Sequence, residues 1–152
     1  MDLFTAQRNA NMLMAAYGLT EKGWRFKWDN AARRFGQCHY GNKTISMSRQ
    51  LTVQRSEASV RNTMLHEIAH ALVGPGAGHG PIWRAKAISI GCDGNRCSND
   101  KVEVAYKYVA KCPNGHIAKK YLRRPRASSS AKSCGTCSPV YNAKYAIKVY
   151  AI

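Results

Sequence analysis

Two histidines and one glutamate are spaced as they would be on a helix that binds a metal ion. The stretch His66-Glu67-Ile68-Ala69-His70 has the pattern HExxH, and residues four apart lie one turn apart on the same face of an α-helix. Both imidazoles can therefore bind a single Zn²⁺ ion. Glu67 falls beside them, close to a zinc-activated water, whose proton it can accept as a general base. The motif predicts a zinc metallopeptidase.

The residues around this motif predict the helix that it requires. Ser56 is a typical capping residue, and apolar residues follow it at helical spacing as far as Val73. The simplest alternative is a pair of histidines on a solvated helix face. It fits poorly, because the neighbouring residues are apolar and the helix should be buried. Buried histidines need polar partners, so the sequence favours metal binding.

A catalytic zinc ion usually has three protein ligands and one open position. His79 is the best third ligand, because the glycine-rich turn over residues 74–78 can fold the chain back toward the helix. His39 is the competing candidate, but it lies in a predicted strand beside a turn. No Asp or Glu occurs between His70 and Asp93, which also favours His79.

Four further ligand residues predict a structural zinc site in the last third of the chain. Cys134 and Cys137 form a strong half-site, because two thiolates at this spacing bind one tetrahedral zinc ion. Cys112 and His116 can complete the set, although a standard knuckle would have its second cysteine at Gly115. The alternative is a group of reduced surface thiols, but so short and basic a segment needs a staple to fold. We therefore expect one catalytic and one structural zinc ion.

The other three cysteines match no good zinc site. We interpret Cys92 and Cys97, which lie in a polar loop, as free thiols, with redox pairing as the alternative. Cys38 is expected to pack as a small apolar side chain.

The periodicity of apolar residues predicts an α+β fold with two domains. Residues 1–100 should form the protease core, in which an antiparallel meander accompanies the HExxH helix, and residues 101–152 should form a basic, all-β zinc ribbon. The predicted helices cover residues 3–17, 56–73 and 81–91, and the predicted strands cover 24–28, 34–40, 43–48, 102–112, 117–123 and 141–150.

The formal net charge of +16 on 152 residues indicates a polyanionic partner. Residues 1–100 contain 13 basic and 7 acidic residues, whereas residues 101–152 contain 11 basic residues and one acidic residue. A serine-rich loop in the second part suits phosphate contacts that do not read the base sequence, and Tyr121 could stack on a base or sugar. The alternative is a solvated basic face that only promotes solubility. The candidate contacts are Lys119, Lys120, Arg123, Arg124, Arg126 and Lys132.

No apolar run is long enough to span a membrane, and the first residues do not resemble a secretory signal. We therefore expect a cytoplasmic protein that is associated with the nucleoid or with DNA, is not secreted and acts as a monomer. In such a reducing compartment, metal binding is a better default for the cysteines than disulfide formation.

Several stretches together resemble the SprT-like metalloprotease family, which includes Spartan. They are Met64-Leu65-His66-Glu67-Ile68-Ala69-His70-Ala71-Leu72, His79-Gly80-Pro81-Ile82-Trp83, Trp24-Arg25-Phe26, Arg34-Phe35-Gly36-Gln37-Cys38 and Lys43-Thr44-Ile45-Ser46-Met47-Ser48. The resemblance covers roughly residues 20–138. It implies a compact zincin-like core with His66, His70 and His79 as zinc ligands and Glu67 as the catalytic acid/base. It also implies a C-terminal zinc ribbon and proteolysis of DNA-bound proteins, including DNA–protein crosslinks.

The sequence thus predicts a zinc metalloendopeptidase that a basic ribbon holds on DNA without sequence preference. One alternative is a non-catalytic nucleic-acid-binding protein in which both zinc ions are structural. Another is a metallopeptidase without a nucleic-acid role, whose positive charge serves an acidic substrate.

Overall fold

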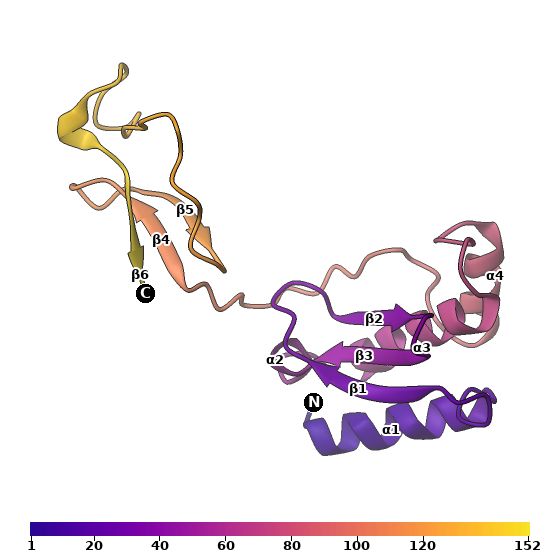
Figure 1. Ribbon diagram of the computed structural model, residues 1–152. Helices are drawn as coiled ribbons and strands as arrows, with labels where there is room; N and C mark the ends of the chain where they lie inside the picture. The colour runs from indigo at the N-terminus through magenta and orange to yellow at the C-terminus, as the bar shows by residue number, and fades with distance from the viewer. The chain divides into compact units, whose positions relative to one another are not determined.

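The computed structural model describes all residues from 1 to 152 and divides into two compact units, Met1–Glu103 and Val104–Ile152. Figure 1 shows the helices in the first unit and a small sheet in each. No helix of the chain has the length and apolar character needed to cross a membrane.

Capping residues set the ends of the two long helices. Helix α1 (Leu3–Ala16) begins where the Asp2 carboxylate accepts a hydrogen bond from the backbone N–H of Thr5, at 2.8 Å. Helix α3 (Glu57–Val73) begins at Ser56, whose hydroxyl accepts a hydrogen bond from the Ser59 N–H, and ends at Gly74. The helix predicted for the HExxH motif is therefore present. The short helices are α2 (Arg49–Thr52) and α4 (Pro81–Ser89).

The strand order of the first sheet differs from the predicted antiparallel meander. Its strands are β1 (Arg25–Asp29), β2 (Gly36–His39) and β3 (Thr44–Ser48), in the order β1-β3-β2. Strand β3 pairs parallel with β1 and antiparallel with β2, so the antiparallel meander was wrong. Strand β3 lies at the centre of the sheet. Four of its five residues are buried, as expected for a strand that is covered on both faces. Strand β2 consequently lies at an edge.

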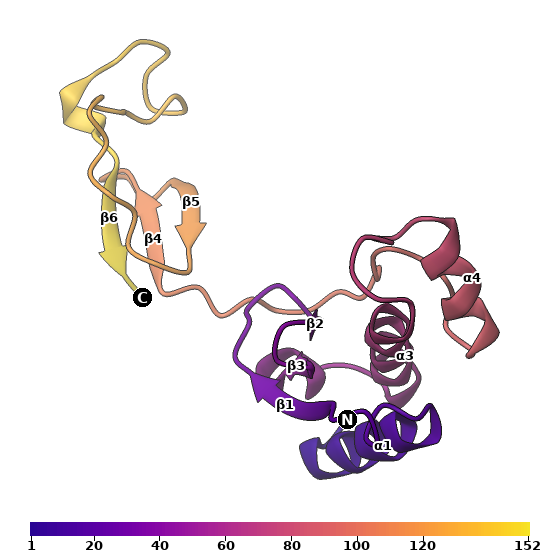
Figure 2. The same ribbon diagram turned by 45° about the vertical axis from the view of Figure 1, so that its right-hand side comes forward.

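Helix α3 is buried on two sides. Val60, Met64 and Ile68 pack with α1 and β3 in the main core, while Leu65 and Ala69 pack toward α4 in a second cluster. Figure 2 shows α3 between α4 and the strands. Residues of the HExxH motif that face neither cluster are left to line an open side of the helix.

The second unit is a three-stranded antiparallel sheet, in the order β5-β4-β6. Its elements are β4 (Tyr108–Lys111), β5 (Ile117–Tyr121), the 3₁₀ helix η1 (Ala143–Tyr145) and β6 (Lys148–Ala151). The strands are shorter than predicted, since residues 102–107 and 141–147 lie outside them. The buried residues are only Ala110, Cys112 and Cys134. So small a core cannot hold the sheet together alone, which agrees with a need for a metal staple.

A buried arginine ties together four segments of the first unit. The Arg55 guanidinium donates to Asp100 at 2.6 Å, to the Thr63 hydroxyl at 2.8 Å and to the Ser59 carbonyl at 3.3 Å. It also lies 3.8 Å from the centre of the Phe35 ring. Because Arg55 is 5% exposed, its charge depends on Asp100 for compensation.

Substituting Asp100→Ala should lower the free energy of unfolding by about 1–2 kcal/mol, because buried Arg55 loses its carboxylate partner. The hydrogen bonds from Arg55 lower the pKa of Asp100 below its ordinary 3.8. The stabilisation should therefore be complete above about pH 4 and disappear as the pH falls further. Denaturant unfolding at several pH values measures both effects, with Glu103→Ala as control, since Glu103 is bound only through its backbone. Equal losses in the two variants would contradict this role.

Candidate active site

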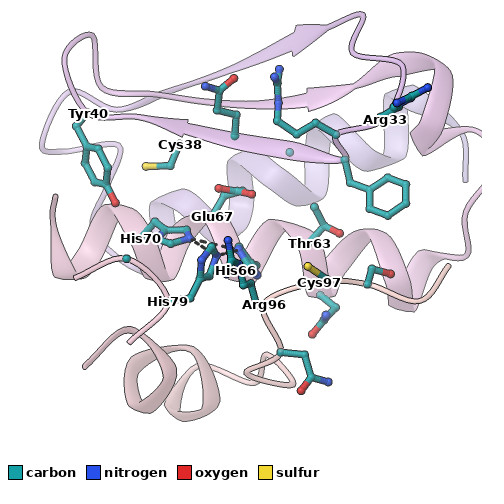
Figure 3. A pocket seen from close by; sticks show the side chains of 18 of the residues that line it. Arg33, Cys38, Tyr40, Thr63, His66, Glu67, His70, His79, Arg96 and Cys97 are labelled. Carbon is teal, nitrogen blue, oxygen red and sulfur yellow. Dashed lines mark hydrogen bonds between the residues drawn. The ribbon is translucent and has the colours of Figure 1, made fainter. Parts of the chain in front are cut away.

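Three histidines converge on the open side of α3. His66 and His70 come from the helix, and His79 comes from the turn that follows it (Figure 3). Their Nε2 atoms lie 3.0 Å (His66 and His79), 3.1 Å (His70 and His79) and 3.3 Å (His66 and His70) apart. The competing candidate His39 lies in β2 and is not part of this cluster. The structure thus brings together the three residues chosen from the sequence.

These nitrogens fit one tetrahedral metal ion. With Zn–N bonds of about 2.0–2.1 Å, two ligand nitrogens of a tetrahedral site would be about 3.3–3.4 Å apart, close to the distances found. Burial, followed by the neighbouring histidines, lowers the pKa of His66 to about 4, and burial with His79 lowers that of His70 to about 4. The rings are therefore neutral near pH 7, which is the form that binds metal.

The orientation of His66 places its Nε2 atom toward the other two histidines. The Asn95 backbone interacts with the same ring and opposes the fall in its pKa. Nε2 is therefore the ring nitrogen that is placed to bind a metal. No pattern in the sequence indicated this interaction, because Asn95 is 29 residues away from His66 in a polar loop.

Trp83 supports all three rings. This side chain of α4 is 1% exposed, and its ring centre lies 4.6 Å from His66, 5.2 Å from His70 and 4.7 Å from His79. Its indole N–H donates to the His66 carbonyl at 3.3 Å. Trp83 therefore positions the ligand rings, whereas the sequence identified it only as part of a motif.

The side chain of Glu67 extends from α3 toward β2, and the residue is 7% exposed. Burial raises the pKa of its carboxyl group to about 7, and the charge of Arg34 opposes that rise. A divalent cation at the histidines would likewise favour the carboxylate. Glu67 can therefore accept and release a proton near neutral pH, as a general base must.

Gly36 of β2 allows this close packing. A Cβ atom at Gly36 would lie 3.1 Å from Cγ of Glu67 and 3.1 Å from Cγ2 of Thr63. The absence of a side chain thus lets the edge strand press directly on Glu67 and limits where its carboxylate can lie. Sequence reasoning missed this residue, because its contact depends on how β2 meets α3.

An open cleft of about 590 Å³ runs past the histidines and Glu67. One wall is formed by residues 33–38 and Tyr40, and the other by residues 95–98 together with the turn that carries His79. Cys38, expected to pack as an apolar residue, does contact the core but also lines the cleft, where burial raises its pKa to about 12. Tyr40 lies beside it (Figure 3). The cleft gives a peptide-sized ligand access to the histidines.

The predicted ribbon site is also assembled. Cys112 Sγ lies 3.8 Å from Cys137 Sγ, and His116 Nδ1 lies 3.5, 3.3 and 3.6 Å from Cys112, Cys137 and Cys134. Tetrahedral zinc would separate two sulfur ligands by about 3.8 Å and a sulfur from a nitrogen by about 3.6 Å. Gly115, where a second cysteine would be standard, instead has a φ of +84°, which suits the turn that leads to His116.

Hydrogen bonds favour thiolates at this site. Backbone N–H groups of Cys137 and Thr136 lower the pKa of Cys134 to about 6. The Asn114 side chain donates to Cys137 Sγ at 3.3 Å. Burial raises the pKa of Cys137, and the hydrogen bond from Asn114 opposes that rise. Thiolates are the metal-binding form of cysteine, so Cys134 is the ligand that its surroundings prepare best for zinc.

Two other cysteines occupy different surroundings. Cys92, placed in a polar loop from the sequence, is in fact buried in the cluster with Leu65 and Trp83. Cys97 is exposed and lines the cleft. Both are free thiols in this structure.

The predicted phosphate-contacting residues are exposed, two on β5 and four in the loop that follows it. Tyr121 is half-buried, with the Lys119 ammonium 5.4 Å from its ring centre. Tyr141 and Tyr150 are the more exposed aromatic residues of this unit, at 58% and 43%. Stacking by Tyr121 stays a prediction, and the exposed rings of Tyr141 and Tyr150 are further candidates.

We expect two zinc ions per chain, because both donor sets fit the metal. Elemental analysis should find one ion after the double substitution Cys134→Ser and Cys137→Ser, and one after His79→Ala. His39→Ala is the matched control and should keep both. A stoichiometry of one in the unaltered chain, or loss of zinc in the control, would contradict this arrangement.

Residues 5–104 match the SprT-like family. No curated protein and no solved structure matches the chain. The matched region covers most of the chain and contains α1 to α4, the first sheet and all three converging histidines. The chain therefore belongs to the SprT-like family.

Proposed function

We propose that this protein is a zinc metalloendopeptidase that cuts proteins associated with DNA, crosslinked proteins among them. The proposal rests above all on one observation: a buried glutamate lies beside three converging histidines in an open cleft. Membership of the SprT-like family supports a domain of the zinc-metalloprotease type.

Glu67 distinguishes an enzyme from a purely structural zinc site. Burial opposes ionisation of its carboxyl group, and the charge of Arg34 offsets only part of that effect. A buried carboxyl group that is only partly compensated destabilises the fold, so a structural site would gain nothing from it. Such groups are characteristic of functional sites.

The residues of the site have separate roles in the proposed peptide hydrolysis. A zinc ion held by His66, His70 and His79 would act as a Lewis acid on the scissile carbonyl. Glu67 takes the proton of the attacking water at its carboxylate and passes it to the leaving amine. Gly36 and Trp83 keep the glutamate and the ligand rings in place.

The second unit supports an association with DNA. It contains no Asp or Glu side chain, while it contains ten Lys and Arg residues. One Zn²⁺ with three thiolates and a neutral histidine adds a net charge of about −1. Its basic residues therefore have no carboxylate side chain of their own unit to pair with, and a polyanion would neutralise them.

Glu67→Gln should abolish cleavage while zinc stays bound, because the amide cannot accept the proton. We expect kcat to fall by about 100-fold or more on a DNA-binding protein assayed with and without DNA. Glu57→Gln, an exposed change on the same helix, should leave activity intact. Undiminished cleavage by zinc-loaded Glu67→Gln protein would rule out this mechanism.

Changing Arg123, Arg124 and Arg126 to Gln should weaken DNA binding. Fluorescence anisotropy at several salt concentrations should show a slope of log K against log salt that is smaller by about 2–3, since up to three phosphate contacts are lost. The matched control changes the exposed Arg8, Arg49 and Arg61 to Gln and alters the net charge equally. Equal losses in both variants would contradict a binding surface on the second unit.

A further inference from the structure

The candidate cleft is itself positively charged. Three arginines line it, Arg33, Arg34 and Arg96, while its only carboxylate is that of the buried Glu67. A divalent cation at the histidines would add two further positive charges. A ligand that enters this cleft therefore meets a cationic surface.

Arg34 and Arg96 differ in how their charge is compensated. The Arg34 guanidinium lies 3.0 Å from the Asp29 carboxylate, and it opposes the rise in the pKa of Glu67. Another ion pair joins Arg55 to Asp100. Arg96 is exposed and has no carboxylate partner.

The base of Arg96 is held in place by its neighbours. The Asn95 N–H donates to Asp93 at 2.9 Å, and the Asp93 N–H donates to the Asn62 side chain on α3 at 2.9 Å. The backbone of Asn95 also engages His66. Because Arg96 comes directly after this anchored turn, its backbone stays beside the metal ligands.

Arg96 lies beside the metal ligands. It lines the same cleft as the three histidines, and Figure 3 shows Arg96 next to them. A guanidinium offers parallel N–H donors that match the two oxygens of a carboxylate. An unpaired guanidinium beside the reacting centre is therefore suited to a carboxylate of the substrate.

We propose that Arg96 forms a subsite for a peptide carboxylate beside the metal centre, so that the cleft prefers acidic peptides. This inference rests on the proposed peptidase function and names its substrate class. The carboxylate belongs either to an Asp or Glu side chain near the scissile bond or to the C-terminus of a short peptide. Arg96 acts here as a specificity residue, and Glu67 does the chemistry.

Binding and cleavage assays on one set of peptides test the proposal. The set contains matched peptides with Glu or Gln near the cleavage site, each with a free or an amidated C-terminus. Binding is measured by fluorescence anisotropy on zinc-loaded Glu67→Gln protein, and kcat/KM is measured on the active protein. We expect a preference for the carboxylate peptide of roughly fivefold, the size of an exposed ion pair, which high salt should reduce. The free and amidated forms show which carboxylate is bound.

Variants at position 96 assign the preference to Arg96. Arg96→Gln should remove it in both assays, Arg96→Lys should restore it in part, and the control Arg8→Gln, on α1, should keep it. Equal binding of Glu and Gln peptides, or a preference that survives Arg96→Gln, would overturn the subsite. Competition by a DNA duplex that depends on Arg96 would also overturn it, since the cation would then serve DNA. If the active protein cleaves the Glu and Gln peptides equally well, the subsite is refuted and the proposed peptidase function is not. If the protein binds the Glu peptide preferentially but cleaves neither peptide, the peptidase function is refuted and the subsite is not.

Discussion

Three imidazole nitrogens that face one another within 3.3 Å are the constraint on which the first unit depends. Without a cation their lone pairs would oppose one another, so the arrangement is stable only where the surroundings hold the rings rigidly. Trp83 contacts all three rings, and α4 holds Trp83 through the apolar cluster that it shares with α3. Apolar packing outside the cleft thus fixes the positions of the three histidine rings. Two sides of α3 are buried, and its third side faces the cleft.

The parts of this site that the sequence predicted are those set by local spacing. The helix from Glu57 to Val73 follows from its cap and its apolar stripe, and the chain returns at Gly74 to bring His79 back to the cluster. What the sequence could not predict depends on contacts between distant segments. The interaction of the Asn95 backbone with His66 and the packing of Gly36 on Glu67 join parts of the chain that lie about thirty residues apart.

The order of the strands in the first sheet is the clearest example of a feature that could not be predicted from the sequence. Alternation of apolar residues indicated three strands, yet it did not indicate that β3 would lie between β1 and β2. The order matters because it puts β2 at the edge of the sheet, where Gly36 meets Glu67 and Tyr40 lines the cleft. In a meander β2 would be central, and the residues that now form one wall of the cleft would be elsewhere. The same strand order that corrects the predicted topology therefore explains how Glu67, the proposed general base, is buried.

The two units differ in whether they contain carboxylate side chains that can pair with their basic residues. In the first, Asp29 and Asp100 each neutralise a particular arginine, and those pairs hold structural segments together. The second unit has no carboxylate side chain, so no ion pair with a side chain of its own can fix any of its basic residues. Binding of phosphates would relieve the mutual repulsion among them, which is the physical basis of the association with a polyanion that we propose. Arg96 differs from Arg34 and Arg55, because it has no carboxylate partner, and it lines the candidate cleft.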